Sequence, residues 1–208
     1  MRKFSSLELL IKYLIDLYYL NNSKRLIVFI SGLSRSGKTT LTMELQKGFL
    51  LQSIMTTVVK LDSWLIDVDK RNEDSTVIER YEIDKINRAI NDLLKGHLVY
   101  PPIYNEVTRK RIEGEVDSPL EFKEGILIVE GVVALSLEDK FKERFTSIYV
   151  EIDDFIRLKR LINFYKYTKK LSKSSYKSLI FDREVEETPF IRSMSKKAQI
   201  IFKWSSTN

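Results

Sequence analysis

Short, continuous apolar runs alternate along the chain with longer stretches in which apolar residues recur at helical intervals. Runs of this kind, rich in β-branched residues, are typical of strands that are buried on both faces of a parallel sheet. They predict strands over 26–30, 56–61, 126–129, 148–152 and 199–202. The helical intervals predict helices over 39–50, 79–95 and 154–171. Strands separated by helices indicate the α/β class with a parallel sheet.

The first segment, 1–22, lies outside this alternation. Its apolar stretch is interrupted by Glu8, Lys12 and Asp16, about one charge per turn, which predicts an amphipathic helix that is too short and too charged to span a bilayer. Ser5 and Glu8 have the spacing of a capping box and so predict the start of this helix. We expect the helix to pack against the rest of the protein, with no membrane as a partner.

Two further segments are predicted to be insertions on a single domain that spans 1–208. The segment at about 98–113 contains adjacent prolines, β-forming residues and alternating charge, which predict an exposed hairpin. The segment at about 157–187 includes a stretch rich in Ser and Lys, 171–177, which we interpret as a mobile loop within a lid.

Residues 32–39 carry the strongest chemical signal. They read Gly-Leu-Ser-Arg-Ser-Gly-Lys-Thr, the pattern of a phosphate-binding loop, between a predicted strand and a predicted helix. Glycines let backbone N–H groups turn toward phosphates, and the helix N-terminus adds partial positive charge. Lys38 is expected to reach the β- and γ-phosphates of ATP, and Thr39 to offer its hydroxyl to Mg²⁺. The predicted nucleotide contacts are Gly32, Ser34, Arg35, Ser36, Gly37, Lys38, Thr39 and Thr40.

Two carboxylates follow predicted strands at their carboxyl ends, the edge where ligands of open α/β sheets bind. Asp62 directly follows the strand at 56–61, and Glu130 follows the strand at 126–129. Phosphoryl transfer to an alcohol needs one group to accept the hydroxyl proton and another to steady the metal. Asp62 is the candidate catalytic base and Glu130 the candidate magnesium partner, although either alone is equally well explained as a solvated strand end.

Charge and cysteine content narrow the class of partners. Lys and Arg number 35 against 29 Asp and Glu, so the formal net charge is +6, which favours anionic partners such as nucleotides. No nucleic-acid recognition motif accompanies the charge, so a small-molecule substrate is expected. The chain has no Cys, which excludes disulfides and thiolate metal sites. We expect a cytoplasmic location and leave a homo-oligomer open.

The motifs resemble those of the uridine kinase (uridine-cytidine kinase) family from about residue 26 to 201. Residues 31–40 look like its phosphate loop, Leu61-Asp62-Ser63-Trp64 like its strand-end motif with the catalytic aspartate, and Val129-Glu130-Gly131 like its acidic turn. The resemblance implies the P-loop kinase (P-loop NTPase) fold, with a five-stranded parallel sheet in the order 2-3-1-4-5 flanked by helices. It also implies transfer of the γ-phosphate of ATP, with Mg²⁺, to a hydroxyl of a nucleoside such as uridine or cytidine.

Further site residues follow from the same resemblance. Residues 156–160 are similar to the basic start of the family's lid helix, where Arg157 is expected to bind the nucleotide and Arg160 to act in catalysis and substrate binding. Asp84 and Tyr104 are implied as substrate contacts. Arg109 stands near the position from which the family reads the nucleobase, and it is counted as a substrate contact too.

Other functions stay open. Residues 109–111, Arg-Lys-Arg, place positive charge where a base-reading group is expected, which favours an acceptor that is a different, anionic hydroxyl metabolite. A nucleotide-dependent switch or a nucleic-acid-stimulated ATPase would use the basic surface instead. Stimulation of ATP turnover by DNA or RNA would favour that second class.

Overall fold

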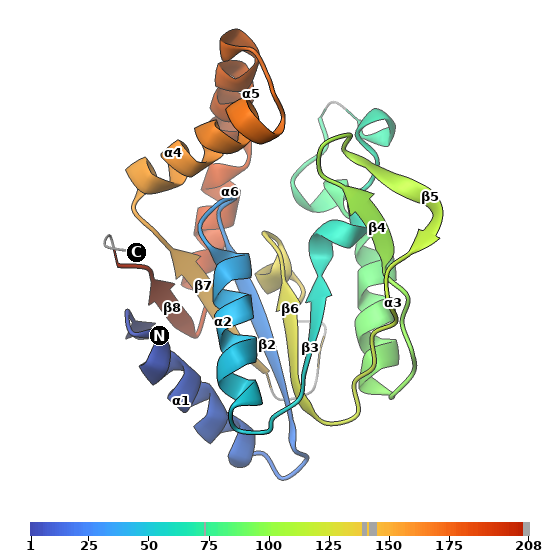
Figure 1. Ribbon diagram of the computed structural model, residues 1–208, viewed down its shortest axis with the longest axis vertical. Helices are drawn as coiled ribbons and strands as arrows, with labels where there is room; N and C mark the ends of the chain where they lie inside the picture. The colour runs from blue at the N-terminus through green and yellow to red at the C-terminus, as the bar shows by residue number, and fades with distance from the viewer. Residues whose placement is uncertain (73, 139–140, 142–144, 206–208) are drawn as a thin grey trace.

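The computed structural model describes residues 1–72, 74–138, 141 and 145–205 (Figure 1). These residues form a six-stranded parallel sheet in the order β1 (Arg2–Phe4), β8 (Ile200–Lys203), β7 (Phe145–Glu151), β2 (Arg25–Gly32), β6 (Gly125–Glu130) and β3 (Thr56–Lys60). All five predicted strands are present, and numbered along the chain they follow the expected order 2-3-1-4-5.

The sixth strand corrects the expectation of a five-stranded sheet. β1 pairs in parallel with β8, with Lys3 opposite Ile201. Its sequence, Arg-Lys-Phe, has no apolar run, because an edge strand is held by one neighbour and its side chains stay largely outside the core. The pattern of apolar residues therefore does not predict β1.

β2 runs through the interior of the sheet and is buried on both faces. Leu26, Val28 and Ile30 belong to one core cluster, and Ile27 and Phe29 belong to the other. Successive side chains of a strand point to opposite faces. An uninterrupted apolar run is therefore the pattern that a strand between two helical layers requires.

Helices cover both faces of the sheet (Figure 1). α1 (Leu7–Tyr19) and α2 (Lys38–Leu50) supply buried side chains to the cluster on one face, and α3 (Ile83–Leu94) and α6 (Thr188–Ser193) to the cluster on the other. α1 starts one residue later than predicted, since the Ser6 hydroxyl accepts a hydrogen bond from the Leu9 N–H at 3.3 Å. No helix in the described ranges is long and apolar enough to cross a membrane.

The chain between β3 and α3 forms short helical turns beside a hairpin. β4 (Pro102–Asn105) and β5 (Lys110–Val116) pair antiparallel, with Asn105 opposite Lys110, which confirms the predicted hairpin. It lies on the side of the molecule away from α4 (Asp154–Asn163) and α5 (Lys173–Glu186) (Figure 1). Turns of 3₁₀ helix occur at Leu61–Trp64, Val68–Lys70, Ile78–Arg80, Ala134–Ser136 and Met194–Lys196.

The C-terminal helices differ from the prediction in two places. The helix expected over 154–171 ends earlier, as α4 (Asp154–Asn163), and continues as a π-helical turn, Phe164–Thr168. The loop expected at 171–177 is wrong, because α5 (Lys173–Glu186) begins there. The Ser172 hydroxyl caps α5 by accepting a hydrogen bond from Ser175 N–H at 3.2 Å, so a serine-rich stretch interpreted as a loop starts a helix instead.

Candidate active site

The phosphate-binding loop joins β2 to α2, and its backbone requires glycine at two positions. Gly37 has a φ of +95° and is the N-cap residue of α2. Gly32 has a φ of +150°, and a Cβ there would lie 2.6 Å from the carbonyl oxygen of Val150. Only glycine meets both requirements without strain. The loop thus places the unpaired N–H groups of the first turn of α2 where anions bind.

Lys38 is the first residue of α2 and lies almost entirely inside the loop. Its side chain is 9% exposed, and Nζ donates to the carbonyl oxygens of Gly32 at 3.0 Å and Leu33 at 2.9 Å. Burial lowers the pKa of Lys38 to about 8, although Asp62 and Glu130 act in the opposite direction. A phosphate oxygen that replaced one of these carbonyls would favour the charged form of the lysine.

Thr39 and Glu130 form the pair expected at a metal. The Thr39 hydroxyl donates to Oε1 of Glu130 at 2.5 Å. Glu130 is 7% exposed, and its other oxygen, Oε2, is buried without a hydrogen-bond partner. The pair fits Mg²⁺, which takes few protein ligands and completes its shell with phosphate oxygens and water. Among the described residues, no group of three or more His, Cys, Asp or Glu side chains could hold a metal.

Asp62 lies in the turn that directly follows β3. In the sheet Lys60 is opposite Glu130, which is also opposite Ile30 of β2, so Asp62, Glu130 and the loop share one edge. The Tyr81 hydroxyl donates to Oδ1 of Asp62 at 3.1 Å. Burial, and then the Asp62 carboxylate, raise the pKa of Tyr81 well above its usual value, so this phenol keeps its proton.

These groups face one cleft of about 660 Å³, which the phosphate loop, the hairpin and the C-terminal helices enclose. The predicted site residues that line it are Ser34, Arg35, Gly37, Lys38, Thr39, Thr40, Asp62, Tyr104, Arg109, Glu130 and Arg160. The polar residues that sequence reasoning missed there include Lys60, Arg71, Arg80, Tyr81, Lys169, Arg183 and Glu187. Most of them lie in stretches without a motif, and only the basic run at 166–170 signalled one of them, Lys169.

Four predicted contacts do not line this cleft. Arg157 does not line the cleft, since its side chain is 2% exposed and its guanidinium pairs with Glu184 at 2.7 Å and with Asp154 at 3.2 Å. Its guanidinium is held against α5 by Glu184, and the residue lines a separate pocket together with Leu33 and Ser36 of the loop. Asp84 is exposed on α3 and is not among the residues that line the cleft. Gly32 and the buried Ser36 build the frame of the loop without lining the cleft.

Ion pairs join the walls of the cleft. Arg80, from the segment before α3, pairs with Glu187 at 2.5 Å and with Glu186 at 3.1 Å, at the end of α5. Arg35 of the phosphate loop lies 3.6 Å from the ring centroid of Phe164 and pairs with Glu106 of the hairpin turn at 3.3 Å. The loop, the hairpin and the C-terminal helices therefore meet around the same space.

The fold and this site define a protein of the P-loop kinase class, because a complete phosphate loop and two strand-end carboxylates face one cleft. A family described as AAA domain matches residues 28–175, more than half of the sequence, and the chain belongs to this family. It is 27% identical over 145 residues to a protein named uridine kinase from Clostridium novyi (strain NT), a match that covers 66% of each chain, just under two thirds. It is 26% identical over 189 residues to a uridine kinase from Staphylococcus haemolyticus (strain JCSC1435), covering 88% of this chain and 89% of that one.

Solved structures share the fold. A Silicibacter sp. TM1040 protein that is described as a kinase of a fructose transport system superposes with a TM-score of 0.74 at 17% identity, covering 95% of this chain and 98% of that one. D-glycerate 3-kinase from Cryptococcus neoformans var. grubii superposes with a TM-score of 0.60 at 10% identity, covering 84% of each chain. At these identities the likeness establishes the P-loop kinase fold and leaves the acceptor open.

Proposed function

We propose that this chain transfers the γ-phosphate of ATP to a hydroxyl group of a small molecule. The observation that supports this most strongly is the position of Asp62, in the turn after β3 and in the same cleft as Lys38 and the Thr39–Glu130 pair. A carboxylate open to the cleft beside a phosphate site is the group that an acceptor hydroxyl needs.

The proposed step is an in-line displacement. The acceptor oxygen forms a bond to the γ-phosphorus, the bond from that phosphorus to the bridging oxygen breaks, and ADP leaves. Asp62 takes the proton of the acceptor hydroxyl. The hydrogen bond from Tyr81 to Oδ1 at 3.1 Å orients the carboxylate and leaves its other oxygen for that proton. When ATP binds, Lys38 donates to phosphate oxygens in place of the loop carbonyls.

The remaining parts of the site stabilise the charge on the transferring group. Thr39 and Glu130 would hold Mg²⁺, which when bound neutralises charge on the β- and γ-phosphates. Arg160 and Arg183 line the cleft from α4 and α5, and Lys169 lines it just after the π-helical turn; Arg160 would have the catalytic role that the family resemblance implied. Preorganised cations at such positions lower the barrier because they need no reorganisation during the reaction.

A nucleoside acceptor is the first candidate, since the relatives are named uridine kinase. Tyr104 and Arg109, which were expected to contact the acceptor, both line the cleft from the hairpin. Uridine and cytidine therefore begin the acceptor panel, and other hydroxyl metabolites, neutral and anionic, follow them.

The test is ADP release with ATP and Mg²⁺ across that panel, with the product confirmed by mass spectrometry. Asp62→Asn should abolish acceptor-stimulated release. Asp84→Asn is the matched control, because Asp84 is an exposed carboxylate outside the cleft, and it should keep wild-type turnover. Acceptor-stimulated turnover that survives in Asp62→Asn, or stimulation by RNA or DNA alone, would contradict the proposal.

A further inference from the structure

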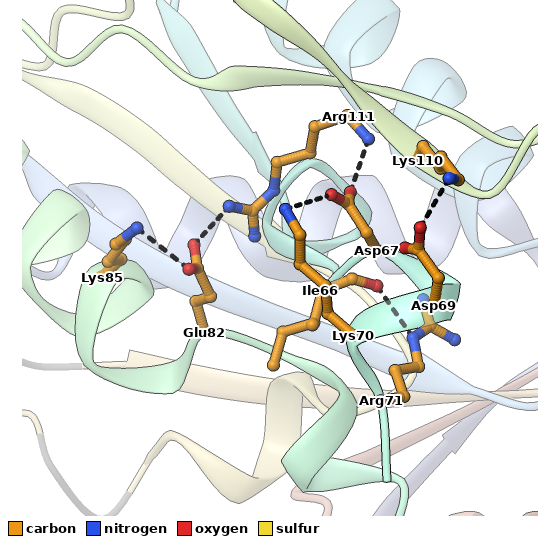
Figure 2. A network of polar contacts seen from close by, with 9 residues as sticks. All are labelled: Ile66, Asp67, Asp69, Lys70, Arg71, Glu82, Lys85, Lys110 and Arg111. Atoms are coloured by element: carbon orange, nitrogen blue, oxygen red, sulfur yellow. Dashed lines mark hydrogen bonds and ion pairs between the residues drawn. The ribbon is translucent and has the colours of Figure 1, made fainter. Parts of the chain in front are cut away.

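The hairpin carries three consecutive cations, Arg109 at the end of its turn and Lys110 and Arg111 at the start of β5, and their partners differ. Lys110 pairs with Asp69 at 2.6 Å from Nζ to Oδ2, and Arg111 pairs with Glu82 at 2.6 Å from Nη1 to Oε2 (Figure 2). Both carboxylates come from the segment between β3 and α3. These two cations are thus matched by acids of the protein, which leaves Arg109 as the cation of the three that lines the cleft.

Two backbone hydrogen bonds fix the position of Arg109. Its N–H donates to the carbonyl of Asn105 at 2.8 Å, and its carbonyl accepts from the Val68 N–H at 3.0 Å. Its φ is +60°, a conformation that costs energy for a residue with a side chain and persists only where the surroundings impose it. In the described part of the chain, no carboxylate pairs with its guanidinium. Burial, and then the positive charge of Arg71, lower the pKa of Arg109.

Arg71 approaches the same wall of the cleft from the other segment. Its Nε donates to the carbonyl of Ile66 at 2.8 Å (Figure 2), and its Nη2 donates to the Tyr104 hydroxyl at 3.0 Å. These bonds fix the plane of the guanidinium, and because Tyr104 accepts from Arg71, its own O–H is left to donate to a ligand. Across the described ranges, Arg71 too has no carboxylate partner.

Two half-buried cations that have no carboxylate partner among the described residues are unfavourable unless an anion joins them. Nine basic and four acidic side chains line the cleft among the described residues. Two of the acids pair with basic residues of the same cleft, and the other two are Asp62 and Glu130, which the reaction uses. No lining acid therefore remains to neutralise Arg71 and Arg109, whereas a planar guanidinium binds phosphate or carboxylate well.

We propose that Arg71 and Arg109, together with the Tyr104 hydroxyl, bind an anionic group of the acceptor, either a phosphate or a carboxylate. The inference rests on the proposed function, since it places the acceptor's hydroxyl at Asp62 and its anionic end at the hairpin wall. The acceptor is then an anionic hydroxyl compound, in place of the neutral nucleoside that the names of the relatives suggest. The phosphate-binding loop and the C-terminal helices then bind the nucleotide.

The first experiment compares anionic and neutral forms of one alcohol by calorimetry. The full chain is saturated with Mg²⁺ and a non-hydrolysable ATP analogue, so that the nucleotide's own phosphate positions are filled. Glycerol 3-phosphate and D-glycerate are titrated against glycerol, and ribose 5-phosphate against ribose. At least one anionic probe should bind about tenfold or more tightly than its neutral partner, because charge-assisted hydrogen bonds are the strong ones. The phosphate and carboxylate probes show which anion is preferred, and equal binding of anionic and neutral probes overturns the proposal.

The second experiment assigns the site to residues. Arg71→Gln and Arg109→Gln should each weaken the anionic probe about tenfold or more and leave the affinity for the ATP analogue unchanged. Unchanged analogue binding also shows that the variants are folded. Lys110→Gln, on the same hairpin but paired with Asp69, is the matched control and should bind both ligands as the wild type does. If the two arginine variants lose the analogue and keep the probe, these arginines serve the nucleotide and the proposal is wrong.

The acceptor panel separates the two proposals. If uridine is phosphorylated, Asp62→Asn stops the reaction and anionic alcohols are the poorer acceptors, then the kinase function stands and the anion site is wrong. If no alcohol stimulates ADP release above the Asp62→Asn rate while the anionic probes bind through Arg71 and Arg109, the anion site stands and the kinase function is wrong.

Discussion

Replacing Tyr81 by Phe removes one hydroxyl from the cleft and leaves the ring in the core. Tyr81 is 7% exposed, and its hydroxyl donates to Oδ1 of Asp62 at 3.1 Å. A hydrogen bond to a charged group contributes about 1.5–3 kcal/mol, and the lower value applies here because Asp62 is exposed and water competes for it. About 1.5 kcal/mol corresponds to about a tenfold change in rate. We therefore expect kcat to fall about tenfold and the KM for ATP to stay unchanged.

The assay is steady-state ADP release with the best acceptor found, over a range of ATP concentrations. The variant's Tm serves as the check on folding. Tyr18→Phe is the matched control, because Tyr18 is equally buried but lies on α1, in the core cluster on the other face of the sheet. If Tyr81→Phe has the kcat of the wild type, the hydroxyl does not orient the base, and the role given to Tyr81 is refuted.

Three further predictions concern the nucleotide side. Burial lowers the pKa of Lys38 to about 8 and phosphate favours its charged form, so the affinity for ATP, measured by calorimetry, should decrease as the pH rises above about 8. A slope that persists in Lys38→Met would contradict this assignment. Glu130→Gln keeps an acceptor for Thr39 but loses the charge, so the Mg²⁺ concentration for half-maximal ADP release should rise about tenfold; an unchanged requirement would exclude Glu130 from the metal site. Arg157→Gln breaks the part-buried pair with Glu184, a charge-assisted hydrogen bond that contributes about 1.5 kcal/mol, and should lower the Tm by a few degrees with no change in the KM for ATP. A raised KM for ATP at an unchanged Tm would instead show that Arg157 contacts the nucleotide.

The amino-acid sequence determined the parts of this protein that are local. The phosphate loop is contiguous, and its glycines, Lys38 and Thr39 perform their roles within one strand, one turn and one helix. Asp62 and Glu130 could be placed because a residue after an apolar strand lies at the carboxyl edge of a parallel sheet. Where a prediction depended on one segment, as in β2 or α2, the structure agrees to within a few residues.

Only the tertiary structure decided which charges meet. Arg157 and Arg160 lie one turn apart on α4, yet one is buried against Glu184 and the other lines the cleft. A basic residue in sequence is equally suited to a salt bridge and to a ligand, and its partner lies on another element, 27 residues away for Arg157 and 107 for the pair of Arg80 with Glu187. Likewise, the triplet at 109–111 is basic throughout, but the carboxylates of the segment before α3 neutralise two of its members. Packing assigns each charge its partner, and the charges left over mark the ligand site.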